Sequence, residues 1–165
     1  MAYQKKKSIV SLITGLLFIA AYCIFAYGRY RTGELAPDNM KAWAEIMLIF
    51  ILIGIVASII IQIVFHVLLS IGIAYKKTIA NKDCADIEVE NSIKAEIVED
   101  EMDKLIGLKS MRISFIAAGT GIIAALVSLV LGSSPALMLN IVFLSFSLGS
   151  ILEGIAQIYY YTKGI

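Results

Sequence analysis

The chain has 165 residues, of which 59% are hydrophobic and 16% charged, and its net charge is +1. Soluble domains are about half apolar and about a quarter charged, so this composition excludes a disordered chain, a disulfide scaffold and an ordinary soluble enzyme. No Asp, Glu, Lys or Arg lies in residues 8–28, 46–75 or 113–152. A membrane span needs about 20 mostly apolar residues, so these runs predict membrane-spanning helices.

The first two predicted spans come from the first two charge-free runs. Residues 8–28 directly follow three lysines, as in a secretory signal sequence, but the apolar part is longer and no small-residue cleavage site follows it. We therefore interpret this segment as an uncleaved span. The second span is predicted over residues 43–74, with Trp43 and Tyr75 as interfacial aromatics at its two ends. Because it is longer than a bilayer requires, we expect it to tilt or to extend past the interface.

The third charge-free run is too long for a single span. It is interrupted by the sequence Gly-Ser-Ser-Pro at residues 132–135, and glycine and proline together mark a turn. The run therefore predicts two antiparallel spans, residues 111–131 and 136–161. The predicted fold class is an all-α membrane protein, a bundle of four transmembrane helices.

The distribution of basic residues predicts the orientation in the membrane. With four spans, both termini and the loop between the second and third spans lie on one side, and that side carries eleven of the 14 Lys and Arg residues. The other side carries only Arg29, Arg31 and Lys41. The positive-inside rule then predicts that both termini are cytoplasmic.

Residues 76–110 form the sizeable soluble part, a predicted cytoplasmic loop. From residue 99 onward apolar residues recur at steps of three and four, which predicts a juxtamembrane helix continuous with the third span. An acidic cluster falls in its first turn, where the helix dipole favours negative charge: Glu99, Asp100, Glu101 and Asp103. A divalent-cation site is the alternative interpretation of this cluster. Because the regular ligand offsets and the bend glycine of an EF-hand loop are absent, we expect no metal site.

The same segment carries a family resemblance. The residues from Val98 to Ile106 read VEDEMDKLI and run through Lys109 into an apolar span. They resemble a motif of small four-span bacterial membrane proteins, uncharacterised families with a domain of unknown function, in which an acidic Asp-Glu-Arg-Asp stretch precedes a transmembrane hairpin. Met102 stands here at the position of the arginine. The resemblance covers residues 98–161 and implies this topology and a bacterial origin, but no particular activity.

Polar side chains within the spans are the candidate functional residues, because desolvating an ionisable group is costly. His66 and Glu153 are predicted at similar depth in the cytoplasmic half of the membrane, with Gln157 one turn further along the face of Glu153. Two interpretations remain open, a structural hydrogen bond between helices and a proton- or ligand-binding site. We interpret Glu45 as a surface residue that extends to the interface at the outer end of the second span. The alternative is that it pairs with Asn140 near the outer surface.

Small residues at four-residue spacing predict helix contacts, because they let two backbones approach closely. We expect the third and fourth spans to pack together. The third span carries two such ladders of small residues, and contact with the fourth span needs only one. The other can contact another helix of the bundle or a second copy in a homodimer, and we favour a contact within the bundle. The ladders are Ala117, Gly121 and Ala125; Ala124, Ser128 and Gly132; and, on the fourth span, Ser150 and Gly154.

No motif of a known enzyme class occurs in the sequence: there is no H-E-x-x-H, no G-x-S-x-G and no P-loop. We therefore predict no enzymatic activity, no cofactor and no nucleic-acid partner. The predicted function is a non-enzymatic accessory, immunity or sensory component of the bacterial inner membrane. Its expected partners are the lipid bilayer and a protein bound through the cytoplasmic loop. The alternative is a small oligomeric transporter or channel that uses Glu153 and His66.

Overall fold

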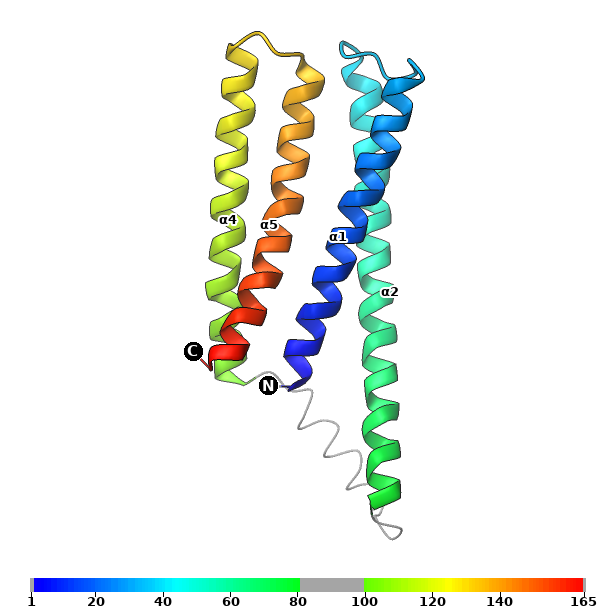
Figure 1. Ribbon diagram of the computed structural model, residues 1–165, viewed down its shortest axis with the longest axis vertical. Coiled ribbons are helices and arrows are strands. Elements are labelled where there is room, and N and C mark those ends of the chain that lie inside the picture. Colours follow the sequence, from blue (N-terminus) through cyan, green and yellow to red (C-terminus); the bar gives the residue numbers. More distant parts are fainter. Residues whose placement is uncertain (1, 81–99, 165) are drawn as a thin grey trace.

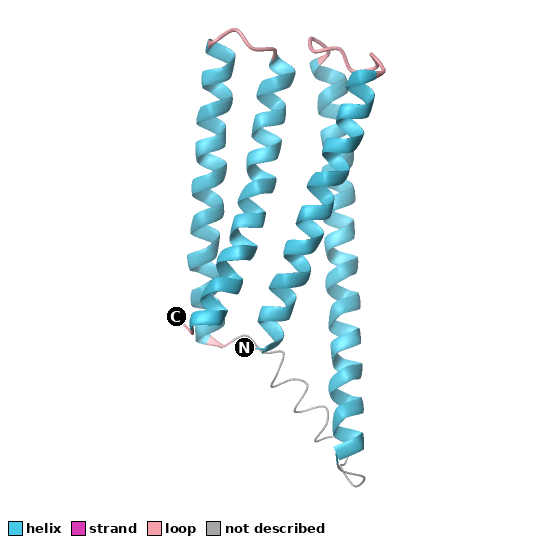
Figure 2. Cartoon of the chain, in the orientation of Figure 1, coloured by secondary structure: helices cyan, strands magenta, loops and turns pink. Residues whose placement is uncertain are grey.

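The computed structural model describes residues 2–80 and 100–164, with side chains described for residues 4–65, 67–68, 71 and 100–164. Within these ranges the regular structure consists of four helices (Figure 2). Each is long and apolar enough to cross a membrane. The prediction of an all-helical fold with four spanning helices is therefore confirmed for the described residues. The helices are α1 (Ala2–Arg31), α2 (Met40–Ala80), α4 (Glu101–Val130) and α5 (Pro135–Lys163).

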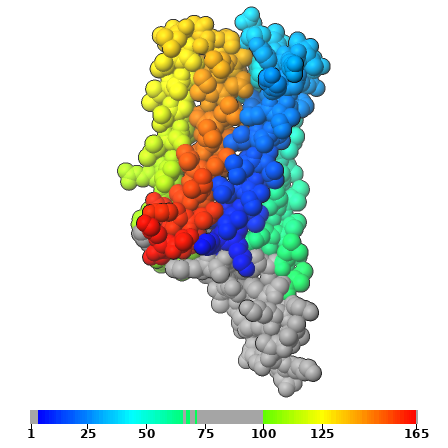
Figure 3. Space-filling view, viewed as in Figure 1, coloured from blue at the N-terminus to red at the C-terminus, as the bar shows by residue number. Residues whose placement is uncertain are grey.

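The helices form a row in the order α4, α5, α1, α2 (Figure 1). α5 packs most extensively against α4 and also against α1, and α1 packs against α2, which in turn touches α5. No comparable packing joins α2 to α4 among the described residues. From one face, α5 and α1 form a continuous surface between the other two helices (Figure 3).

The two ends of the bundle are easy to distinguish. Both termini of the chain lie at one end, which we call the termini end (Figure 1). The opposite end, which we call the turn end, holds the connection from α1 to α2 and the turn from α4 to α5. That turn contains Gly132 at φ 83°, a left-handed conformation that glycine adopts without steric cost. α5 then begins with Ser134 as its N-cap and a proline in its first turn, a combination that favours helix initiation.

Two of the acidic residues at the start of α4 cap the helix. Asp100 is the N-cap, and its side chain accepts a hydrogen bond of 2.7 Å from the backbone N–H of Asp103. The Asp103 carboxylate accepts one of 3.2 Å from the backbone N–H of Asp100 in return. This reciprocal capping box satisfies two helix-terminal donors. From there a single helix covers both the predicted juxtamembrane segment and the predicted third span.

Small residues let α4 and α5 approach closely, as expected for these spans. A Cβ atom on Gly149 would lie 2.9 Å from the carbonyl oxygen of Ser114. Gly121 faces Ser145 directly, and Ala125 is buried. Gly121 and Ala125 belong to the first predicted ladder, so that ladder does lie in the interface between α4 and α5.

The other predicted small residues have different roles. Ala124 is exposed, and Gly132 lies beyond the helix in the turn, so the second ladder does not continue through the interface. Gly154 packs against α1, where an added Cβ would lie 3.3 Å from a methyl group of Leu12. The fourth span therefore uses its small residues toward two neighbours.

The outer surface of α2 is apolar and exposed. Leu48, Leu52 and Leu68 are 60%, 62% and 65% exposed, and similar residues cover the rest of the described helix. A contiguous apolar surface of this size causes aggregation in water, whereas lipid chains solvate it. The protein is therefore a multi-pass membrane protein.

Candidate functional site

The turn end of the bundle holds an aromatic and aliphatic core, beside a pocket of about 410 Å³. Tyr22 of α1 is 1% exposed, and its ring centroid lies 4.3 Å from that of Phe143 and 5.3 Å from that of Phe50. These three rings come from α1, α5 and α2, so one cluster joins three helices. Trp43, Ile46 and other buried side chains complete it.

A hydrogen bond between helices lies inside this core. The Tyr22 hydroxyl donates to Asn140 Oδ1 over 2.7 Å, and Asn140 Nδ2 donates to the backbone carbonyl of Ala136 over 2.8 Å. The amide of Asn140 therefore uses both its oxygen and its nitrogen within the protein. This arrangement fixes α1 against α5, and we assign it a structural role.

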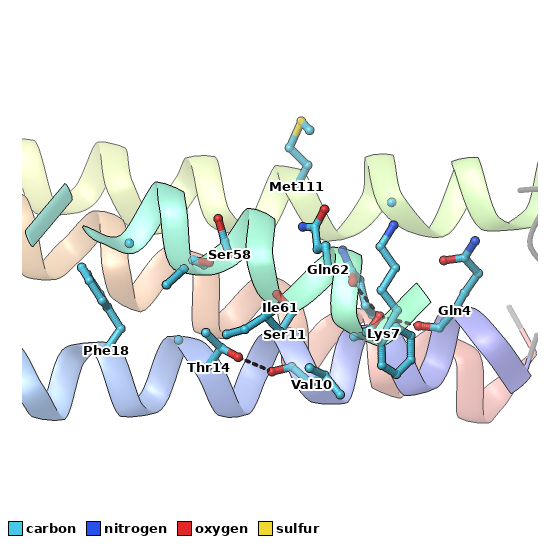
Figure 4. Close-up of a pocket in the computed structure, with 18 of the residues that line it drawn as sticks. Gln4, Lys7, Val10, Ser11, Thr14, Phe18, Ser58, Ile61, Gln62 and Met111 are labelled. Atoms are coloured by element: carbon cyan, nitrogen blue, oxygen red, sulfur yellow. Dashed lines mark hydrogen bonds between the residues drawn. The ribbon is translucent and has the colours of Figure 1, made fainter. Parts of the chain in front are cut away.

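The termini end, by contrast, contains a cavity of about 910 Å³ lined by all four helices. It extends from Phe18 in the middle of α1 to Gln4 near its start (Figure 4). At 1.5 Å of rise per residue, this part of α1 is about 21 Å long. The volume lies within the range of about 300 to 1,000 Å³ that is typical of small-molecule sites.

The lining of the cavity changes from apolar to polar along its length. Near the membrane centre it is formed by Phe18, Ile51, Ile55 and other apolar groups. All charged side chains that line it in the described part of the chain lie at the termini end: Lys7, Asp103 and Lys104. Figure 4 shows this order, with Phe18 at one end and Lys7 at the other. The cavity is therefore amphipathic along the axis of the bundle.

Two hydroxyl groups in the middle of the cavity, those of Thr14 and Ser58, bond to their own helices. Thr14 Oγ1 donates to the carbonyl of Val10 over 2.9 Å (Figure 4), and Ser58 Oγ donates to the carbonyl of Ile55 over 2.8 Å. Such bonds leave no donor to a ligand from these hydroxyls. The middle section thus offers small side chains and space more than polar recognition.

A chain of hydrogen bonds links the cavity wall to Glu153. Ser8 Oγ donates to Gln157 Oε1 over 2.8 Å and also lies 3.0 Å from the carbonyl of Gln4. Gln157 Nε2 donates to Glu153 Oε1 over 3.3 Å. Ser8 and Gln157 line the cavity, so the Glu153 carboxyl is connected to it through one amide. This places Gln157 on the same face as Glu153, where the sequence predicts it.

Asp103 combines its capping role with a second property. The residue lines the cavity, is only 7% exposed, and uses Oδ2 for the capping bond. Its other oxygen, Oδ1, is buried and has no hydrogen-bond partner among the described residues. A buried acceptor without a donor costs about 1–3 kcal/mol, so this atom requires an explanation.

The remaining candidate residues lie away from the cavity. Glu45 is exposed and pairs with Lys41 over 3.9 Å, while Asn140 bonds to Tyr22. The alternative pairing of Glu45 with Asn140 is therefore wrong, because Glu45 is exposed and pairs with Lys41 on its own helix, and Asn140 bonds to Tyr22 of α1. Glu101 is exposed and pairs with Lys104 over 3.0 Å.

Some of the predictions fall on undescribed positions. The side chain of His66 and the whole of Glu99 lie outside the described residues, as does the loop segment 81–99. The pairing of His66 with Glu153 therefore stays a prediction. Among the described residues, no group of three or more His, Cys, Asp or Glu side chains is arranged to hold a metal ion.

Sequence reasoning missed the cavity itself. Its signal is a set of small and polar residues at helical spacing on three separate spans. On α2, for example, Gly54, Ser58 and Gln62 follow one another at four-residue steps, and α1 carries Gln4, Ser8, Ser11 and Gly15. Each stripe alone resembles a helix contact, and only the fold shows that the stripes face a common space.

Comparison of the chain with protein-family models, with curated protein sequences and with solved structures finds no match.

Proposed function

We propose that this protein is a non-enzymatic sensory or accessory component of the bacterial inner membrane that binds an amphiphilic small molecule in its cavity. The observation that carries the proposal is the cavity of about 910 Å³, which is apolar toward the membrane centre and charged at one end. Ligand sites combine a mostly apolar wall with a few placed polar groups. An amphiphile matches both parts of this wall.

The route into the cavity supports a ligand that comes from the bilayer. Both α2 and α4 line the cavity, yet these two helices do not pack together in the part of the chain that the structure describes. We infer that the cavity opens toward the lipid between these two helices. A molecule already dissolved in the membrane therefore has the shortest path to the apolar section.

The proposed orientation places the charged end of the cavity in the cytoplasmic leaflet. It follows from the excess of Lys and Arg at the termini end. The head group of a bound amphiphile then lies beside the first turn of α4. That turn belongs to the loop over residues 76–110, which we propose contacts a protein partner, so occupancy of the cavity is well placed to affect that contact.

Filling the cavity tests the proposal. Ser58 lines the cavity, and the next residue, Ile59, points outward with 53% of its surface exposed. We expect Ser58→Phe to abolish binding of a phospholipid to the purified protein, measured by native mass spectrometry, because the added ring occupies the space. Ile59→Phe is the matched control and should bind like the original protein. Equal binding by both variants contradicts the proposal.

A small oligomeric transporter is the second candidate, favoured by the hydrogen bond from Gln157 to Glu153 beside the cavity. One chain leaves the cavity open on one side, so this function needs a second copy, for example packed through the exposed face at Ala124. Flux through proteoliposomes that depends on Glu153, and is lost in Glu153→Gln, is the expected result. Flux that does not change in this variant removes the basis of this candidate.

A further inference from the structure

We propose that the head group recognised at the charged end of the cavity contains both a primary ammonium and a phosphate. This inference rests on the proposed function, since it assigns the chemical class of the bound amphiphile. It follows from the charged residues that line this end: one acidic side chain with an unused acceptor, and two basic side chains.

Asp103 supplies the first part of the argument. Its Oδ1 is buried and receives no hydrogen bond from any described residue, although the residue lines the cavity. Helix capping explains only the other oxygen, Oδ2, which lies 3.2 Å from the Asp100 nitrogen. The final torsion of an aspartate side chain is soft, so the carboxylate can turn toward a donor that enters the cavity. A donor with positive charge forms the strongest such bond.

The two lysines supply the second part. Lys7 of α1 and Lys104 of α4 line the same end of the cavity. Lys104 also pairs with Glu101 over 3.0 Å, and both side chains are more than half exposed. An exposed ion pair contributes about 0–1 kcal/mol, so this pair does not prevent Lys104 from binding an anion. A phosphate next to the ammonium complements this positive charge, whereas a purely cationic head group would be repelled by it.

The rest of the cavity determines the apolar part of the proposed ligand. The charged end gives way to a section with small and polar side chains, among them Thr14 and Ser58, and then to Phe18, Ile51 and Ile55. The apolar section at Phe18, Ile51 and Ile55 buries a long apolar chain. Together, the two ends describe a zwitterionic phospholipid that has N–H donors on its head.

Three lipids with identical acyl chains separate the elements of this proposal. Phosphatidylethanolamine has phosphate and N–H donors, phosphatidylcholine has phosphate and a positive charge without N–H, and phosphatidylglycerol has phosphate without an amine. We expect about tenfold tighter binding of the first than of the other two in native mass spectrometry, as a charge-assisted hydrogen bond implies. This comparison uses the unaltered protein, so its outcome does not depend on a variant that folds.

A pair of variants then assigns the preference to a residue. Asp103→Asn keeps an oxygen that can cap the helix but presents an amide instead of a second carboxylate oxygen. We expect this change to reduce the preference for phosphatidylethanolamine to less than about twofold. Glu101→Gln lies in the same turn, removes the same charge and does not line the cavity, so it should keep the full preference.

The outcomes distinguish this inference from the proposed function. Equal binding of the three lipids, with all of it lost in Ser58→Phe, overturns the head-group assignment and leaves the cavity as the site. Tighter binding of phosphatidylglycerol also overturns it, since that result means that the lysines alone select the head group. If Asp103→Asn keeps the preference for phosphatidylethanolamine, Asp103 does not recognise the ammonium group. If no lipid binds, or if Ser58→Phe does not reduce lipid binding, the proposed function itself is contradicted.

Discussion

The two ends of this bundle differ in how the helices pack: the turn end holds the buried aromatic and aliphatic core and a pocket of about 410 Å³, whereas the termini end holds the larger cavity of about 910 Å³. At the turn end, Tyr22, Phe50 and Phe143 fill the space between three helices with large rings. At the termini end, the equivalent space is lined by small residues such as Ser8 and Ser58, and a cavity remains. The size of the side chains along each helix therefore determines where the bundle closes.

This difference separates stability from binding within one small domain. The packed end holds the buried cluster and the hydrogen bond between Tyr22 and Asn140. The termini end holds the charged side chains of the cavity wall and the unpaired acceptor on Asp103. We therefore expect changes at the turn end to affect the free energy of unfolding, and changes at the termini end to affect ligand binding.

The largest expected effect comes from comparing the removal of an aromatic ring from the buried core with the removal of one from the cavity wall. Tyr22→Ala should lower the free energy of unfolding by about 3–5 kcal/mol, as for other buried aromatic residues changed to alanine. Phe146 lines the cavity and is 54% exposed, so Phe146→Ala should cost less than about 1 kcal/mol. Circular dichroism during titration with a denaturing detergent measures both. Similar losses in the two variants would mean that the cavity wall at Phe146 is packed as tightly as the core.

The contact between α4 and α5 gives the next effect. Gly149→Ala places a methyl group 2.9 Å from the Ser114 carbonyl oxygen and should cost about 1–3 kcal/mol, since overpacking forces the backbones apart. Gly119 has no atom within 4 Å of an added Cβ, so Gly119→Ala is the control and should gain about 0.5–1 kcal/mol. The same unfolding assay applies. A control that loses as much as Gly149→Ala would indicate that helix contacts do not cause the loss.

A smaller effect is expected from the hydrogen bond at the packed end. A double-mutant cycle with Tyr22→Phe and Asn140→Leu should give a coupling energy of about 0.6 kcal/mol, the average for such bonds between membrane helices. The unfolding free energies of the two single variants and the double variant supply this value. A coupling energy of zero would show that the bond of 2.7 Å adds nothing beyond the packing of the ring.

Ser58→Phe is expected to change the free energy of unfolding least, although it should have the largest effect on lipid binding. Ser58→Phe extends into open space and should change the free energy of unfolding by no more than about 0.5 kcal/mol, as should Ile59→Phe on the outer face. Unfolding of both variants in parallel checks this. A loss of several kcal/mol in Ser58→Phe alone would mean that its side chain meets packed atoms and that the cavity is smaller than 910 Å³.

The fold was largely predictable because its signals are local. A charge-free run long enough to cross a bilayer defines each span, and glycine with proline defines the turn around Gly132. The contact of Gly121 with α5 also follows from spacing, since a small residue at every fourth position forms a stripe on one helix face. These features depend on neighbours in the sequence and need no knowledge of the whole bundle.

The site was less predictable because it depends on which helices become neighbours. Depth alone offered Glu45 as a partner for Asn140, but the partner is Tyr22, an aromatic residue in an apolar run. Likewise, Asp103 reads in the sequence as a helix cap, and only the tertiary structure places it on a cavity wall. Depth along a helix can be counted from sequence, whereas the order of helices around the bundle cannot.

Mapping where a bound lipid lies tests the central claim most directly. A phosphatidylethanolamine with a photoreactive group in its acyl chain should label the cavity-facing residues of α2 and α4, such as Gln62 and Met111, as identified by mass spectrometry of the cross-linked peptides. This labelling should fall sharply in Ser58→Phe, while labelling of the lipid-exposed Leu48 and Val130 stays the same. If Gln62 and Met111 are labelled no more than these outer residues, and Ser58→Phe changes nothing, the cavity does not hold the lipid and the account is wrong.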